Sequence, residues 1–181
     1  IDALDYLVPG IDDKYIASTY LNLSLALRNQ YAYDEALAYV KKGLQIASNP
    51  INKIKLLNSK AIIFSQKKEY DKSIQTYSQI LKDSIVKKNK KEYARIKDNI
   101  AFTQWLSNKS LNVEKKLITA LNLRKSLNDT SGLIASYSHL MKYFENVDKI
   151  KAINYAKLLY KLTIEQDNIE DRLEALSYLR K

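Results

Sequence analysis

The chain has 181 residues and a net charge of +10, with three glycines, two prolines, no cysteine and one histidine. The lack of cysteine excludes disulfides and cysteine-bearing metal or iron–sulfur sites, and a lone His139 excludes a site with several histidine ligands. Three glycines and two prolines are too few for the many turns of a β-sandwich or barrel, so these folds are disfavoured. The 46% of hydrophobic residues is typical of a globular chain.

Apolar residues recur at helical spacing along most of the chain. Leu23 and Leu27 are four residues apart, and Leu37 and Val40 are three apart, which is the i, i+3, i+4 recurrence of buried helix faces. Short polar stretches separate the helices. Pro50 lies in one of these stretches, because a proline cannot lie inside a helix and its ring excludes the preceding residue from the α region. The pattern predicts helices at residues 12–29, 33–47, 51–67, 70–87, 91–107, 111–127, 131–145 and 149–166, and a ninth from about Glu170.

Pairs of small or apolar residues, twelve positions apart, recur in four repeats. Another small or apolar residue follows each pair seven positions later. A single helix pair cannot bury its own apolar face, so we expect the pairs to stack into one solenoid core. The anchor pairs are Ser24 and Ala36, Ala61 and Ser73, Ala101 and Val113, and Leu140 and Ala152, followed by Gly43, Ile80, Ala120 and Leu159.

This pattern resembles the tetratricopeptide repeat, in which small residues lie where two helices cross. Ala36 and Gly43 fit the resemblance well, whereas Val113 and Leu140 are bulky where small residues are usual. The resemblance covers residues 14–166 and implies an all-α, right-handed α-α superhelix of about four helix pairs plus a terminal helix. We expect a single domain over 1–181, with repeats at roughly 14–50, 51–89, 90–129 and 130–168, and a further helix starting within 169–181.

A narrower resemblance concerns composition. Long repeats rich in Lys, Asn and Tyr resemble the sensor regions of signalling proteins from Bacteroidetes-type bacteria. In that group the repeats precede a membrane helix and then a histidine kinase or a DNA-binding module. The resemblance implies a non-enzymatic sensor or scaffold segment of a larger signal-transduction protein. Its location would be periplasmic, or cytoplasmic if the resemblance fails. No apolar run here approaches the length of a membrane span, although a flanking membrane helix is compatible with this interpretation.

Positive charge is concentrated in the middle of the sequence. Residues 1–50 carry a net charge of −2, residues 51–127 carry +12, and residues 128–181 are neutral. A basic centre can attract nucleic acid, so a nucleic-acid-binding helical repeat is the alternative function. The lysines are scattered and are not clustered with arginine, which favours a solvated surface and disfavours nucleic acid as the partner.

Candidate chemistry centres on His139, the one histidine that could act as a general base. Its position in the repeat matches those of Leu23 and Ile100. We therefore expect a structural histidine at the edge of the core, with its hydrogen bonds satisfied within the protein. No serine–histidine–carboxylate triad can be assembled around it, and a small hydrolase is the least favoured alternative. Phosphate-binding glycine motifs are missing as well. We therefore predict no enzyme activity, no cofactor and no catalytic or metal-ligating residue.

The resemblance does imply a binding surface. In this family the first helix of each pair lines a concave groove, and aromatic residues are enriched in binding hot spots. We expect this groove to bind a protein or peptide, and self-association of the chain is an alternative. An alternative is that extra helix turns or a neighbouring chain cover the aromatic side chains. The predicted groove residues are Arg95, Asn99, Phe102, Trp105, Tyr137, Met141 and Phe144.

Overall fold

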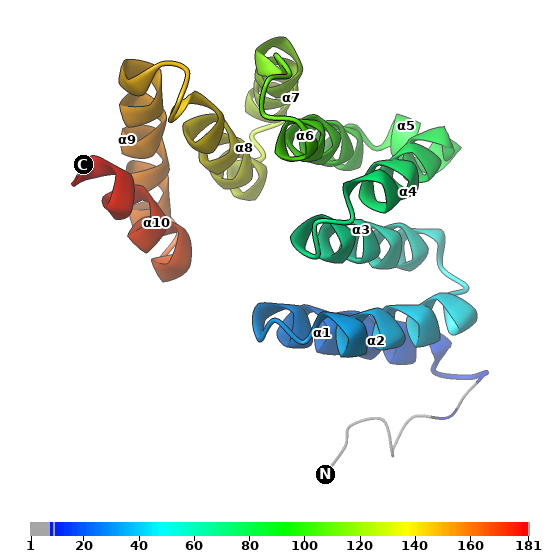
Figure 1. Cartoon of the computed structure of the whole chain (residues 1–181). Helices are drawn as coiled ribbons and strands as arrows, with labels where there is room; N and C mark the ends of the chain where they lie inside the picture. The colour runs from blue at the N-terminus through cyan, green and yellow to red at the C-terminus, as the bar shows by residue number, and fades with distance from the viewer. Residues whose placement is uncertain (1–7, 9, 181) are drawn as a thin grey trace. The chain divides into compact units, whose positions relative to one another are not determined.

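A computed structural model describes residue 8 and residues 10–180, and this part of the chain contains ten helices and no strand. The helices follow one another in antiparallel pairs joined by short turns (Figure 1). The all-α class is thus confirmed. The helices are α1 (Asp13–Asn29), α2 (Tyr33–Ile46), α3 (Pro50–Gln66), α4 (Tyr70–Lys82), α5 (Ser84–Lys88), α6 (Lys90–Ser107), α7 (Glu114–Ser126), α8 (Thr130–Phe144), α9 (Lys149–Glu165) and α10 (Ile169–Leu179).

Contacts between helices divide the chain into two compact units, with the boundary between Lys88 and Asn89. In the first unit, α1 pairs with α2 and α3 pairs with α4, and α3 also packs against α1 and α2. In the second unit, α6 pairs with α7 and α8 with α9, and α10 packs mainly on α9. Each unit therefore stacks helix pairs, as the repeats predict. The single domain over 1–181 stays a prediction.

The anchor residues lie where the helices cross, as their constant spacing predicts. All eight are at most 4% exposed, including the bulky Val113 and Leu140. The Ser73 hydroxyl donates to the carbonyl oxygen of Ala61 at 2.7 Å, which joins the two anchors of the second repeat directly. At Gly43 a β carbon would lie only 2.8 Å from Cδ2 of Leu56, so α2 and α3 approach closely because this position has no side chain.

Gly43→Val is therefore expected to destabilise the first unit by about 1–3 kcal/mol, because its side chain must displace Leu56 from a close-packed crossing. Ala26→Val is the control, since Ala26 is exposed on α1 and its change costs only helix propensity, less than about 1 kcal/mol. Urea unfolding followed by circular dichroism measures both. Equal, small losses would show that the crossing has room for a side chain.

The turn inside each of the first two pairs has the same backbone geometry. Tyr31 adopts φ 63°, and the amide of Ala32 donates to the Leu27 carbonyl at 2.9 Å. Lys68, which lies one repeat later, adopts the same φ of 63°. A left-handed residue followed by such a hydrogen bond is a standard helix ending that satisfies free carbonyl groups. The turns of the first two helix pairs therefore repeat in geometry, as the helices do.

Two predicted helices differ from the structure. The helix over 70–87 is broken at Asp83, whose ψ of 131° is extended and whose carboxylate accepts the Ile85 amide at 2.8 Å. The helix expected from residue 111 begins only at Glu114, whose amide is bonded to the Asn112 side chain at 3.1 Å. In both places a short polar side chain binds a backbone amide two residues ahead and competes with the helical hydrogen bonds.

Candidate functional site

Most of the predicted groove residues on α6 and α8 are buried. Trp105, Tyr137, Met141 and Phe144 are at most 7% exposed and belong to the hydrophobic core of the second unit. The expectation of an exposed aromatic patch is therefore wrong for Trp105, Tyr137 and Phe144, which are covered as in the alternative. Partner binding by this region stays a prediction.

Later helices of the same chain cover the aromatic residues of α8. The ring of Tyr155, on α9, stacks on Phe144 with centroids 5.8 Å apart and lies 6.2 Å from the ring of Tyr137. From α10, Tyr178 donates a hydrogen bond to Glu145 at 2.9 Å. Burial and this carboxylate raise the pKa of Tyr178. Coverage by neighbouring helices explains why positions that line a groove in the family are internal here.

Trp105 is enclosed by its own unit. Its ring meets that of Tyr143 edge to face at 5.9 Å, and the Lys109 ammonium lies over it at 3.1 Å from the ring centroid. Burial lowers the pKa of Lys109, although Glu145 acts in the opposite direction. A cation on the tryptophan face is attracted by the ring quadrupole and adds to the cover over this ring.

Arg95, Asn99 and Phe102 form the accessible part of the predicted groove, and we call them the α6 strip. Their spacing of four and three residues places them on one face of α6, and all three are partly exposed. Arg95 forms an ion pair with Glu92 on the same helix. Phe102 stacks on the His139 imidazole, with centroids 3.9 Å apart and an interplanar angle of 9°.

A buried charge network lies behind the α6 strip. The Asp98 carboxylate, fully buried, accepts a hydrogen bond from Nη1 of Arg124 at 3.1 Å and pairs with Nδ1 of His139 at 2.8 Å. Arg124, 1% exposed, also donates to the Ser136 hydroxyl at 2.7 Å and to the Gly132 carbonyl at 2.6 Å. We call these residues the Asp98 network. It joins α6, α7 and α8.

The network is arranged to hold a buried charge. Burial alone would raise the pKa of Asp98, but His139, Arg124 and Ser136 outweigh it and hold that pKa below its usual value. Ser136 bonds to Asp98 and Arg124, which is not the arrangement of a nucleophile held by a histidine. The side chain of His139 is 17% exposed and satisfied by Asp98, which confirms the prediction of a histidine at the core edge.

Acid is expected to weaken the wild-type chain more than an Asp98→Asn variant. Because the folded pKa of Asp98 is depressed, its contribution is complete above the unfolded pKa, about 3.9, and is lost as pH falls through the folded pKa. The measurement is the urea midpoint of each protein between about pH 6 and pH 3. We expect this midpoint to fall more steeply with decreasing pH in the wild type than in the variant. Equal slopes in the two proteins would mean that Asp98 has the same pKa in the folded and the unfolded chain, and would contradict this prediction.

Sequence reasoning missed the Asp98 network, although one signal was present. Asp98 lies three residues before the anchor Ala101, and Arg124 lies four residues after the anchor-face residue Ala120. Both charged residues therefore share a helix face with buried positions. Opposite charges on two buried helix faces are typical of a buried ion pair. The sequence pattern alone, however, does not specify that these two faces pack against each other.

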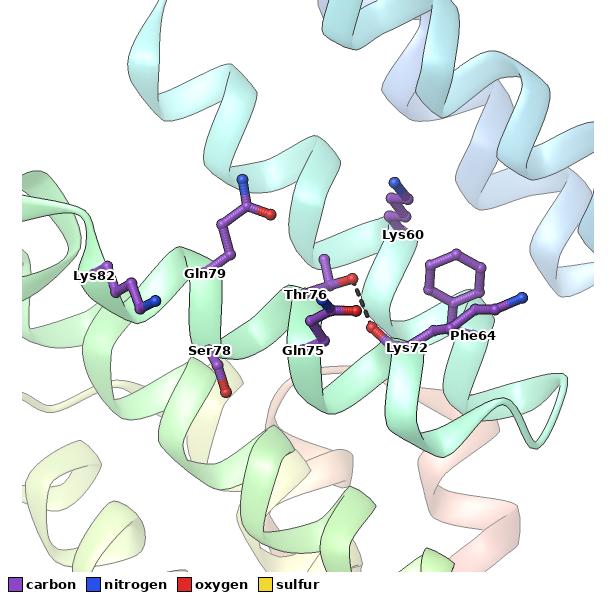
Figure 2. A pocket seen from close by; sticks show the side chains of 8 residues that line it. All are labelled: Lys60, Phe64, Lys72, Gln75, Thr76, Ser78, Gln79 and Lys82. Carbon is purple, nitrogen blue, oxygen red and sulfur yellow. Dashed lines mark hydrogen bonds between the residues drawn. The ribbon is translucent and has the colours of Figure 1, made fainter.

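The first unit contains a polar depression between α3 and α4, with a volume of about 620 Å³. Lysine and glutamine side chains line it together with one phenylalanine ring at one end, and we call the site the lysine–glutamine hollow (Figure 2). None of the groove residues predicted from the sequence lines it. Its principal lining residues are Lys60, Phe64, Lys72, Gln75, Gln79 and Lys82.

Within residues 8 and 10–180, no three histidine or acidic side chains gather as they would around a metal ion. In the same residues no helix combines the length and the apolar character that crossing a membrane requires. The candidate functional features of the described residues are the α6 strip and the lysine–glutamine hollow.

Comparisons with known proteins support a helical repeat. No family model matches the chain. It is 33% identical over 78 residues to the photosystem I assembly protein Ycf3 of Prochlorococcus marinus subsp. pastoris, covering 43% of this chain and 45% of the relative. The corresponding protein of Prochlorococcus marinus strain MIT 9312 is 38% identical over 75 residues, covering 41% and 43%. The chain thus spans less than half the length of these relatives.

A solved structure shows the same fold over most of the chain. The crystal structure of BtubC from P. vanneervenii matches with a TM-score of 0.63 and 17% sequence identity, covering 87% of this chain and 67% of that protein. Together with the stacked helix pairs, this likeness shows an all-α solenoid of the tetratricopeptide type.

Proposed function

We propose that this chain, whose fold and relatives support a tetratricopeptide-repeat family, is a non-catalytic protein-interaction or assembly module. The observation that carries the proposal is the row of amphipathic helix pairs. These bury one face in the core and leave polar and partly apolar side chains, such as the α6 strip, on the other. Ycf3 is named as an assembly protein, which supports a scaffold role in the sense of bringing polypeptides together.

The more specific role that we propose is a sensor or scaffold segment of a larger bacterial signal-transduction protein. The lysine-, asparagine- and tyrosine-rich composition of the long repeats supports it. A periplasmic location accompanies that role, and a cytoplasmic one fits the assembly role alone. The partner in either case is a protein or peptide, and self-association is one form of it.

The α6 strip offers a direct test. Arg95→Ala/Asn99→Ala removes two partly exposed polar side chains, whereas Lys97→Ala/Ser107→Ala removes two exposed ones that lie away from the strip on α6. Tagged chains are cross-linked in their native cells and purified after nuclease treatment, and their adducts are identified by mass spectrometry. We expect a defined protein partner that the first double variant loses and the control retains. Partners that are indifferent to both variants, or adducts that nuclease removes, would contradict the proposal.

A further inference from the structure

We propose that the lysine–glutamine hollow binds an acidic segment of a partner polypeptide. This rests on the proposed function and adds to it the chemistry of the partner and a second place of contact. The hollow lies in the first unit, between α3 and α4, and shares no residue with the α6 strip. Its own charges, amides and shape carry the inference.

Charge is the first argument. The segment from α3 to α5, residues 50–88, carries nine lysines against three acidic residues. In the hollow, Lys72 bonds to Glu69 at 2.6 Å. Among the residues that the structure describes, Lys60 and Lys82 have no carboxylate partner, and the Lys60 ammonium lies 5.7 Å from the ring of Phe64. Two uncompensated ammonium groups at the rim of a hollow favour an anionic occupant.

Shape is the second argument. Lys82 lies at one end of the hollow and Lys60, Phe64 and Lys72 at the other, with the glutamines between them (Figure 2). Lys82 lies ten positions after Lys72 on α4, a rise of about 15 Å, which is the length of four or five extended residues. Each glutamine amide both donates and accepts, as a peptide backbone requires. The hollow therefore suits a short extended peptide with carboxylates near its ends.

The same side chains fit a peptide better than a nucleic acid. A base needs a free aromatic face on which to stack. Phe64 is the one aromatic lining residue, and the ammonium groups of Lys60 and Lys72 each lie 5.7 Å from its ring. The hollow also has no arginine, the side chain that binds phosphate in a bidentate manner. Lysine point charges and amides match carboxylates and peptide groups instead.

Fluorescence anisotropy tests the proposal with the full chain. The probe is a labelled short peptide in which glutamates alternate with leucines, and its comparison peptide has glutamine at every glutamate. Lys60→Gln/Lys82→Gln is expected to weaken binding of the acidic probe about fivefold or more, because two solvent-accessible charge contacts, one partly exposed and one exposed, are lost. Lys53→Gln/Lys87→Gln removes the same charge from exposed positions outside the hollow and should leave the affinity unchanged.

Several results would overturn the proposal. Equal weakening by both double variants would show general attraction by a basic surface, and equal binding of the glutamine peptide would remove the role of charge. Tighter binding of a single-stranded oligonucleotide of equal charge would assign the hollow to nucleic acid. The test is separate from that of the α6 strip. A partner lost by Arg95→Ala/Asn99→Ala, together with no binding of the acidic probe, would reject the hollow and keep the proposed function.

Discussion

Replacing Asp98 by alanine is expected to destabilise the second unit by about 3–5 kcal/mol. The substitution leaves the Arg124 guanidinium, 1% exposed, without its carboxylate in a site that excludes water. It also removes the partner of Nδ1 of His139. Urea unfolding can be followed by helical circular dichroism and by the fluorescence of Trp105, the one tryptophan of the chain, which lies in the same unit.

Two comparisons separate a buried charge from an ordinary aspartate. Asp71→Ala removes an exposed aspartate at the start of α4 and should cost no more than about 1 kcal/mol. The double variant Asp98→Leu/Arg124→Met removes both charges and should be more stable than Asp98→Ala alone, because no unpaired charge then stays buried. If Asp98→Ala costs no more than Asp71→Ala, the Asp98 network does not hold the second unit together.

Trp105→Ala is expected to act on stability, with a loss of about 3–5 kcal/mol. The side chain is 6% exposed and packs in the core of the second unit beside the rings of Phe102 and Tyr143, so its removal leaves a large cavity. Circular dichroism during urea unfolding measures the loss without needing the tryptophan signal. Tyr15→Ala is the control, because it truncates an aromatic ring that is 60% exposed on α1.

The alternative for Trp105 is a binding residue on an open surface. In that case Trp105→Ala would leave the urea midpoint within the range of Tyr15→Ala and would still abolish partner capture. Such a result would restore the aromatic patch that the sequence predicts, and it would contradict the buried position in the structure.

The positions at which the helices cross could be predicted from the sequence. Two helices can approach closely only where their side chains allow it, and a repeat reproduces that place at a fixed spacing. Ser24 and Ala36 reveal the spacing, and it then locates Val113 and Leu140 correctly although neither is small. The break at Asp83 escaped prediction because it depends on one side chain that binds the Ile85 amide.

The candidate sites depend on contacts between distant residues, which a repeat pattern does not specify. Phe144 has the position of a groove residue, but Tyr155 on α9 covers it. Asp98 and Arg124 are 26 residues apart and meet only because α6 and α7 pack as a pair. The lysine excess in the middle of the chain is visible in the sequence, whereas the hollow appears only once α3 and α4 lie side by side.

The central claim is that this chain holds another polypeptide on an exposed face of its helical repeats. Hydroxyl-radical footprinting of the full chain, with and without the partner captured by cross-linking, tests it most directly. We predict that the partly exposed Phe102 of the α6 strip becomes protected, while the exposed Tyr15 and Tyr31 keep their reactivity. Unchanged reactivity of Phe102 in a saturated complex, or protection confined to Tyr15 and Tyr31, would contradict the account.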